Sequence, residues 1–347
     1  MLANSRPWVI VLAGGVGSRF WPVSTPERPK QLLPLVDDGP LITDTIDRAR
    51  SLVPDERIRI LAGEHLVEPF RSSLPNFPDD SYLCEPLARG TAPALAWAAW
   101  HIAQIDPDAV MISLHADHII RPHEAFRETV AAAVDVVLRH GLLVCIGTVP
   151  NRIEVGYGHV EPGERLDADG GLKAYRVRAF HEKPDRQTAH RYVEAGHFWN
   201  TGIFVWKART LLEEIEQHAP EIHRCMPLLE KNPEAFFEAV PTSVIDRAVV
   251  EQSERFAVLR APFPGDDVGN WEALTRLHLS DTQGNVIVGT GQTVESNDNV
   301  VFTDQGSVVL FGIKNLVVIR TRDRTVVLPR ERAADLKELL EQLDSEA

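Results

Sequence analysis

Residues 8–35 read WVIVLAGGVGSRFWPVSTPERPKQLLPL, an apolar run that leads directly into a glycine-rich loop. The run 8–13 has the length and character of a buried strand. Glycines in the following loop permit positive φ and close approach, so backbone N–H groups can face a phosphate chain. The dinucleotide fingerprint would begin at Gly15, but its third glycine position holds Phe20, and a P-loop lysine is missing. The stretch therefore predicts either a phosphate loop outside those two classes or a plain structural turn.

Outward from this stretch, short apolar runs alternate with amphipathic or alanine-rich segments as far as about Leu279. Alternation of this kind is typical of a sheet wound with helices. We expect helices over 91–105 and 124–139, and an α/β fold with a Rossmann-like mixed sheet covered by helices on both faces. The runs predicted to be strands are 8–13, 58–62, 110–114, 142–147 and 202–206.

The pattern changes after Asp281, where short β-rich stretches are separated by Gly, Asn and Asp. We therefore divide the chain into a domain over 1–280 and a small β-rich domain over 281–347, for which a left-handed β-helix is one candidate form. Leucines at 336, 339, 340 and 343 follow helical spacing, which predicts a closing helix over 331–343. This domain would either pack on the first one or pair two subunits into a homodimer.

Composition excludes several classes of protein. The chain has 36 Lys and Arg against 50 Asp and Glu, a net charge of −14, which disfavours nucleic-acid binding. No apolar run approaches the roughly 20 residues needed to span a bilayer, and the N-terminus lacks a secretory pattern. Three widely spaced cysteines argue against a disulfide framework. We expect a cytoplasmic protein that binds neither membrane nor nucleic acid.

A second chemical signal lies at the end of the predicted strand 110–114, in the sequence His115-Ala116-Asp117-His118. Carboxyl ends of strands face the ligand crevice in open α/β sheets, so Asp117 is placed to hold a metal. The two histidines raise the alternative of a zinc or manganese hydrolase, but their spacing matches no established ligand set. Mg²⁺ prefers oxygen ligands, so we assign the histidines a supporting or structural role.

One lysine is predicted as a phosphate partner from the local sequence. Pro29 precedes Lys30 and restricts the backbone, which presents the ammonium group from a stiff loop as a phosphate partner. The string from Leu12 to Leu35 resembles the signature of the sugar nucleotidyltransferases. Further blocks in the same order resemble the mannose-1-phosphate guanylyltransferase family over nearly the whole chain. These blocks are 85–94 (EPLARGTAPA), 156–158 (GYG), 180–185 (FHEKPD), 198–206 (FWNTGIFVW), 245–251 (IDRAVVE), 265–271 (GDDVGNW) and 284–286 (GNV).

The resemblance implies a transferase that moves GMP from GTP to mannose 1-phosphate, giving GDP-mannose and pyrophosphate by in-line attack at the α-phosphorus with Mg²⁺. It implies catalytic roles for Arg19, Lys30, Asp117 and Asp267, with Asp117 and Asp267 as the metal ligands. Around the sugar phosphate it places Gly156, Tyr157, Glu182, Lys183, Asn200 and Thr201. Around the nucleotide it places Leu12, Ala13, Gly14, Gly15, Gly17, Ser18, Arg19, Lys30, Glu85, Arg89, Gly90, Thr91 and Asp117.

Some positions depart from the family pattern. The family has Pro where this chain has His115, and Asn where it has Gly90, so a side chain near the base is lost. Asp266 beside Asp267 leaves the register of the metal ligand open. The alternatives are a nucleotidyltransferase for glucose 1-phosphate with UTP or dTTP, a regulatory paralogue without activity, and an NAD-dependent oxidoreductase, against which the missing third glycine counts.

Overall fold

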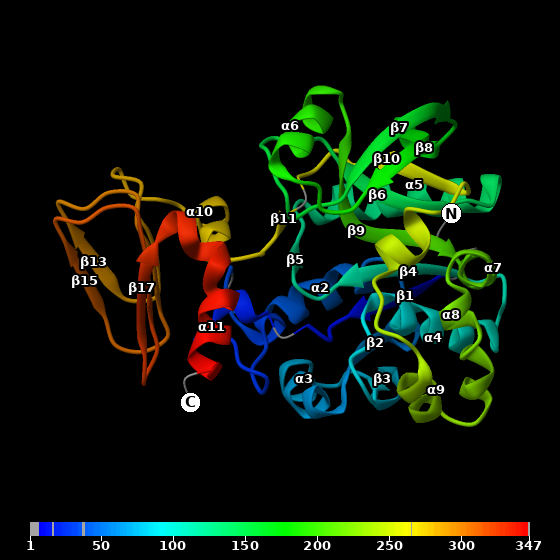
Figure 1. The fold of residues 1–347 in the computed structure, drawn as a ribbon, viewed down its shortest axis with the longest axis horizontal. Coiled ribbons are helices and arrows are strands. Elements are labelled where there is room, and N and C mark those ends of the chain that lie inside the picture. Colours follow the sequence, from blue (N-terminus) through cyan, green and yellow to red (C-terminus); the bar gives the residue numbers. More distant parts are fainter. Residues whose placement is uncertain (1–6, 16, 37–38, 265, 346–347) are drawn as a thin grey trace.

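The computed structural model describes residues 7–15, 17–36, 39–264 and 266–345. A large sheet with its helices forms one part of the molecule, and a smaller β-rich part lies beside it (Figure 1). Within the described residues the large sheet is mixed and has the order β3-β2-β1-β4-β9-β6-β10-β8-β7. Its strands are β1 (Trp8–Leu12), β2 (Ile58–Gly63), β3 (Tyr82–Glu85), β4 (Val110–His115), β6 (Leu143–Thr148), β7 (His159–Leu166), β8 (Lys173–His181), β9 (Phe198–Lys207) and β10 (Phe256–Arg260).

The centre of this sheet explains where the chemistry gathers. β1 runs parallel to both β2 and β4, and Leu12 is paired with His115 at their carboxyl ends. The glycine-rich loop and the segment that carries Asp117 therefore leave the sheet side by side, as a crevice at the strand ends requires. β9 runs antiparallel between β4 and β6, which makes the sheet mixed.

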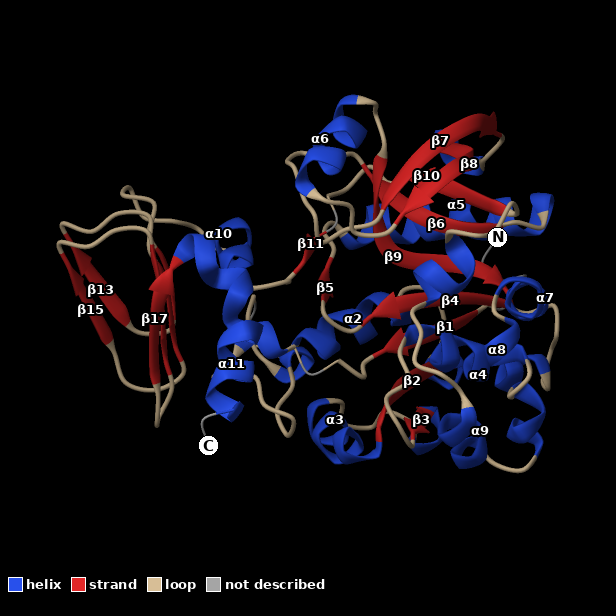
Figure 2. Ribbon diagram, in the orientation of Figure 1, coloured by secondary structure: helices blue, strands red, loops and turns tan. Residues whose placement is uncertain are grey.

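Helices cover both faces of the sheet, as predicted (Figure 2). In β1 the side chains of Val9 and Val11 enter one core, and those of Trp8 and Ile10 enter the other. Burial on both faces explains why this strand is a continuous apolar run rather than an alternating one. One core contains side chains of α2 (Leu41–Arg50), α3 (Val67–Ser73) and α5 (His123–His140), and the other those of α4 (Thr91–Ala103), α7 (Ala208–His218), α8 (Pro220–His223) and α9 (Pro233–Ala239).

The predicted strands and helices all exist, with shifted ends. The run 202–206 is the later part of β9, which begins at Phe198. Four strands of the large sheet were missed, among them β8, whose residues are mostly half-buried or exposed and include charged ones, so that it lacks a continuous apolar run. The helix α6 (Arg186–Glu194) follows β8, and Asp185 accepts a hydrogen bond from the Thr188 N–H at its start. No helix in the described part of the chain has the length and apolar character needed to cross a membrane.

The C-terminal part is a stack of short parallel strands, the arrangement of a β-helix. Asn285 and Asn299 are stacked inside it, and Asn299 Nδ2 donates to Asn285 Oδ1 at 2.9 Å. The hand of the coil stays a prediction. The strands are β12 (Val286–Val288), β14 (Val300–Thr303) and β16 (Leu316–Arg320) in one sheet, β13 (Gly291–Val294) and β15 (Val308–Phe311) in another, and β17 (Thr325–Pro329), which is antiparallel to β16.

A shared core joins the two parts of the molecule. Trp271 is fully buried, and its ring centroid lies 4.9 Å from that of Phe20 and 5.0 Å from that of Phe302. The β-helix therefore packs on the segment that follows the glycine-rich loop, which was one of the two roles expected for it. The short helix α10 (Leu274–Leu277) follows Trp271, and Leu274 belongs to the same core.

The closing helix differs from the prediction over 331–343. The structure has a 3-10 helix over Arg330–Asp335, and α11 begins only at Leu336 and runs to Ser345. Arg330 explains the late start, because its guanidinium donates to Glu272 at 2.9 Å and to the Asp298 carbonyl at 2.9 Å. These bonds hold the first turn against the segment around Trp271 and against the β-helix before the regular α-helix begins.

Candidate active site

Two cavities adjoin at the carboxyl ends of the central strands. The larger measures about 610 Å³ and the smaller about 260 Å³, and Thr91, His115 and Asp117 line both. A junction of this kind lets two ligands meet at one point. The residues predicted for the nucleotide that line the larger cavity are Leu12, Gly14, Gly15, Gly17, Lys30, Glu85, Gly90, Thr91 and Asp117.

The glycine-rich loop is held by a residue that the sequence reasoning missed. Gln31 is buried, and its Nε2 donates to the Ala13 carbonyl at 2.5 Å and to the Gly15 carbonyl at 2.9 Å. Gly17 has φ +72°, and a Cβ there would lie 2.3 Å from Lys30 Cβ. Glycine is therefore required at this position. The signal for Gln31 was its place directly after the Pro-Lys pair.

Lys30 and Asp117 form an ion pair at the junction. Lys30 Nζ lies 2.9 Å from Asp117 Oδ2, and the lysine is 5% exposed. Burial alone would raise the pKa of Asp117, but the Lys30 ammonium and the neighbouring histidines outweigh burial and hold that pKa well below its usual range. Asp117 therefore carries a negative charge at neutral pH.

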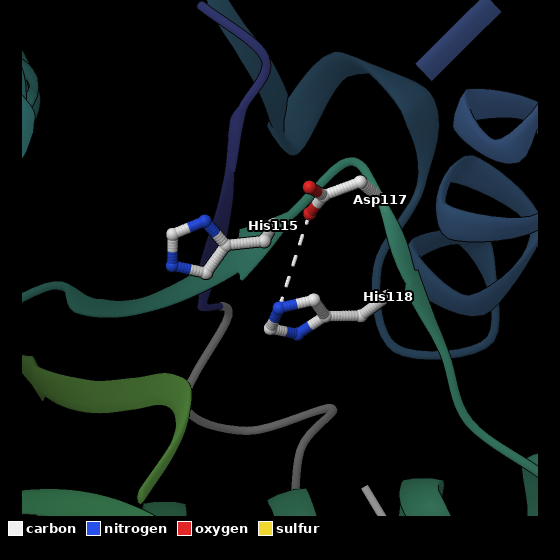
Figure 3. Close-up of side chains that lie close together, drawn as sticks. All are labelled: His115, Asp117 and His118. Atoms are coloured by element: carbon white, nitrogen blue, oxygen red, sulfur yellow. Dashed lines mark ion pairs between the residues drawn. The ribbon is translucent and has the colours of Figure 1, made fainter. Parts of the chain in front are cut away.

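His115 and His118 lie beside Asp117 (Figure 3). One ligand atom from each of the three residues lies within 4.8 Å of the others, and the two imidazole centroids are 4.9 Å apart. Burial lowers the pKa of both histidines, that of His118 to about 3. Both rings are therefore neutral near pH 7, with nitrogen lone pairs available.

The backbone of Asp267 lies beside these three residues. The short strand β11 (Asp266–Asp267) is antiparallel to β5 (His118–Ile119), and Asp267 is paired with His118. Segments far apart in the sequence thus meet beside Asp117. The side chains of Asp266 and Asp267 lie outside the described part of the structure, so their metal role and the choice between them stay predictions.

The smaller cavity collects all six residues predicted for the sugar phosphate. Lys183 Nζ lies 2.9 Å from Glu182 Oε1, and Lys183 has φ +50°, a left-handed conformation that is uncommon for a lysine. The Thr201 hydroxyl donates to the Ile146 carbonyl at 2.7 Å, which anchors β9 beneath the cavity. The six residues are Gly156, Tyr157, Glu182, Lys183, Asn200 and Thr201.

Two further carboxylates support this cavity, and the sequence reasoning gave them no role. Asp246 begins a π-helical turn over Asp246–Val250, and Glu251 follows it. Asp246 Oδ1 accepts a hydrogen bond from Asn200 Nδ2 at 3.0 Å, and Glu251 Oε1 accepts one from the Glu182 N–H at 2.7 Å. Burial, together with the charge of Glu182, raises the pKa of Asp246 to about 7.

Four residues predicted for the nucleotide do not line either cavity. Ala13, Ser18 and Arg19 belong to the loop. The Ala13 carbonyl accepts a hydrogen bond from Gln31, and the Ser18 carbonyl accepts one from the Trp21 N–H at 3.1 Å. Arg89 donates to the Phe237 carbonyl at 2.8 Å and so is held away from the larger cavity. Beside it, Gly90 has φ +83°, and a Cβ would lie 2.3 Å from the Ser243 carbonyl oxygen. That close contact accounts for glycine in place of the family's asparagine.

The cavities, the glycine-rich loop and the sheet order together agree with one family of proteins. The sequence model described as nucleotidyl transferase matches residues 8–284. The chain belongs to that family. A second model, described as a MannoseP isomerase/GMP-like beta-helix domain, matches residues 281–343 of this nucleotidyl transferase, where the structure has its stacked parallel strands.

Relatives of this nucleotidyl transferase extend the match over nearly its whole length. It is 34% identical to mannose-1-phosphate guanylyltransferase of Klebsiella pneumoniae, over 96% of this chain and 73% of that protein. It is 32% identical to the alginate biosynthesis protein AlgA of Pseudomonas aeruginosa, over 97% of this chain and 72% of that protein. A crystal structure from Thermus thermophilus, described as a mannose-1-phosphate geranyltransferase, is 32% identical with a TM-score of 0.87, over 97% of this chain and 99% of that one.

Proposed function

We propose that this nucleotidyl transferase moves GMP from GTP to mannose 1-phosphate and releases pyrophosphate. The observation that carries the proposal is the junction of the two cavities at Thr91, His115 and Asp117. The larger cavity has the volume for a nucleotide, and the smaller one has that for a sugar phosphate. The choice of substrates follows the names of the relatives that match over nearly the whole chain.

The reaction needs little acid-base chemistry from the protein. A phosphate monoester has its second pKa near about 6, so the sugar phosphate already presents an anionic oxygen at neutral pH. That oxygen attacks the α-phosphorus and forms a new P–O bond, while the bond to the bridging oxygen of the β-phosphate breaks and pyrophosphate leaves. The difficulty is the repulsion between two polyanions, so the protein acts by positioning and by placing cations.

The described residues supply these functions at fixed places. The glycine-rich loop and the start of α4 at Thr91 line the larger cavity, and backbone N–H groups there would bind the phosphate groups. Lys30 stabilises the negative charge that develops on the departing pyrophosphate. On the other side, Lys183 exchanges its contact with Glu182 for the phosphate of the sugar. Glu182 and Asn200 are then available to the sugar hydroxyls.

A divalent cation fits the junction, because Asp117 is ionised and carries an oxygen that is not bonded to Lys30. We assign Asp117 and Asp267 as the residues that hold Mg²⁺. When bound, the cation neutralises phosphate charge and orients the phosphate oxygens. The family resemblance supplies Asp267, and its backbone pairing with His118 supports the assignment.

Base choice is assigned to Glu85, which lines the larger cavity and lies close to the glycine-rich loop. Its carboxylate can accept hydrogen bonds from guanine N1–H and the N2 amino group. Burial raises the pKa of Glu85 to about 7. A bound guanine would favour the ionised form by donating to it.

The test is a matrix of nucleoside triphosphates against sugar 1-phosphates, with pyrophosphate release as the signal. We expect GTP with mannose 1-phosphate to exceed ATP, UTP, dTTP and glucose 1-phosphate by at least about tenfold in kcat/KM, or about 1.4 kcal/mol. Equal turnover of UTP or dTTP with glucose 1-phosphate would assign the chain to another branch of the family. No release from any pair would favour a regulatory paralogue.

Location and assembly complete the proposal. The three cysteines are free, which agrees with a reducing compartment such as the cytoplasm.

Val309 and Phe311 on β15 are 65% and 68% exposed, and we assign this strip as the contact of a homodimer through the β-helix. Light scattering of Phe311→Asp should then give a smaller mass than the unchanged protein, whereas equal masses would remove the dimer contact from this strip.

A further inference from the structure

Histidine at position 115 gives this chain nitrogen donors where the family resemblance implies only carboxylates. Asp117 directs its two oxygens to different partners, since Oδ2 lies 2.9 Å from Lys30 Nζ and Oδ1 lies 3.9 Å from His118 Nε2. Figure 3 shows His115 and His118 on the same side of the Asp117 carboxylate. One oxygen can therefore stay with Lys30 while the other faces two imidazoles.

The spacing of these three side chains suits one metal ion. Ligand atoms bound to the same metal by bonds of about 2.1 Å lie about 3 to 4.2 Å apart. The atoms of His115, Asp117 and His118 all lie within 4.8 Å of one another, so a shift of less than about 1 Å closes the set. Rotation about the side-chain bonds provides a shift of that size.

Gly202 shows that the structure around His115 is adapted to its ring. A Cβ at Gly202 would lie 2.9 Å from two atoms of the His115 imidazole and 3.6 Å from the His118 ring. Gly202 also has φ +70°, and its N–H donates to Asn200 Oδ1 at 3.0 Å. The space for the imidazole pair is thus made by the strand that also lines the sugar cavity.

We propose that His115, Asp117 and His118 form a transition-metal site at the junction of the two cavities, which prefers Co²⁺, Zn²⁺ or Mn²⁺ to Mg²⁺. Two imidazole nitrogens and one carboxylate oxygen are typical ligands of these borderline metals, whereas Mg²⁺ favours oxygen alone. The relevance of the site to catalysis rests on the proposed function, but the binding does not. The ion would lie where the nucleotide and sugar phosphate meet.

The experiment measures binding of Co²⁺ and of Mg²⁺ separately by calorimetry, on untagged protein without nucleotide or sugar phosphate. Any carboxylate site binds Co²⁺ somewhat more tightly, so the decisive quantity is the ratio of the two dissociation constants. Loss of an outer partner of a ligand costs about 10- to 100-fold in metal affinity, so loss of His115 or His118 as a ligand should cost at least about 10-fold. We expect His115→Ala and His118→Ala each to lower the ratio of the dissociation constant for Mg²⁺ to that for Co²⁺ by at least about 10-fold. The affinity for Mg²⁺ should change by less than about twofold.

His190→Ala is the matched control, because His190 is half-exposed on α6 and lies outside the group. It should keep the full ratio. If an alanine variant fails to fold by circular dichroism, His115→Asn and His118→Gln replace each imidazole by an amide, a poor metal ligand, and should give the same loss. The visible absorption of bound Co²⁺ should change with each variant of the pair.

The proposal would be overturned if the ratio in both the His115 and the His118 variants stayed within about twofold of its value in the unchanged protein. Equal affinity of the unchanged protein for the two metals would overturn it as well. Failure of guanylyl transfer in the substrate matrix leaves this titration readable, since no substrate is present in it. Conversely, loss of the metal preference leaves pyrophosphate release to be judged by itself. The two proposals therefore fail separately.

Discussion

The larger cavity is lined by residues from the first third of the chain, including three glycines of one loop, whereas the smaller one is lined by segments that are spread from Thr91 to Asp246. Gly14, Gly15 and Gly17 open the first cavity, and Glu182, Lys183 and Asp246 surround the second. A phosphate chain can be bound by N–H groups that any sequence possesses, provided that the loop is free of side chains. A sugar needs particular side chains at particular angles, so its cavity depends on tertiary contacts.

Asp117 belongs to both cavities, and its replacement should have the largest effect. Asp117→Asn removes the ionised oxygen and leaves the buried Lys30 ammonium without its ion-pair partner. We expect kcat/KM to fall by about 10³, the upper range for losing one preorganised electrostatic group. Steady-state kinetics checks this at several Mg²⁺ concentrations, well below the melting temperature of the variant. Near-normal turnover at limiting Mg²⁺ would remove Asp117 from the metal site.

Lys30→Ala tests the nucleotide side alone. The ammonium lies beside Asp117 and 5.5 Å from the centroid of the Phe20 ring, so its loss removes positive charge from the larger cavity together with a contact to Phe20. We expect a fall of about 10² in kcat, typical of one lost charge partner. Lys231→Ala, an exposed lysine outside both cavities, serves as the control. A Lys30 variant that loses only stability would contradict its catalytic role.

The same contrast explains what could be predicted from the sequence. The strand 8–13, the glycine-rich loop and Lys30 are neighbours in sequence, and their local pattern carries most of the chemistry of the larger cavity. Asp246 and Glu251 lie in a recognisable block, but their role depends on a π-helical turn that no apolar periodicity marks. Arg89 was predicted for the nucleotide, yet it contacts the Phe237 carbonyl, a partner that only the fold reveals.

Asp246, which lines the smaller cavity, should make the stability of the protein depend on pH. Burial and the neighbouring charge of Glu182 raise the folded-state pKa of Asp246 to about 7, so its protonated form is favoured in the folded protein. The stability that protonated Asp246 contributes is therefore fully present below the unfolded-state pKa of about 3.9. This contribution to the free energy of unfolding is lost as the pH rises towards 7 and through it. Asp246→Asn keeps an acceptor for Asn200 Nδ2 without this titration.

Between pH 5 and 8, the unchanged protein should lose about 2 kcal/mol of unfolding free energy relative to Asp246→Asn. Urea unfolding at both pH values measures the difference. Glu85 has a raised pKa as well and titrates in both proteins, so its contribution cancels in the comparison. Parallel stability curves for the two proteins would show that Asp246 ionises normally in the folded state and that the network around Asn200 is weaker than its geometry indicates.

Glu251 should give the smallest effect and the sharpest separation of the two cavities. Its Oε1 accepts the Glu182 N–H at 2.7 Å and so fixes the backbone just before Lys183, which adopts φ +50°. Glu251→Ala leaves that N–H without its acceptor, and the left-handed turn that presents Lys183 to the sugar phosphate loses its support. We expect KM for mannose 1-phosphate to rise about tenfold, while kcat and KM for GTP change little.

Glu251→Gln separates positioning from charge, because its amide oxygen can accept the same hydrogen bond. We expect it to restore KM to within about twofold of the unchanged protein, since the net contribution of such a bond, about 1 kcal/mol, would be recovered. Lys183→Ala provides the reference, with a larger rise in the same KM. An equal rise in KM for mannose 1-phosphate in the Ala and Gln variants would mean that the charge of Glu251, rather than its bond to the Glu182 backbone, shapes the cavity. A rise in KM for GTP would show that the two cavities are coupled.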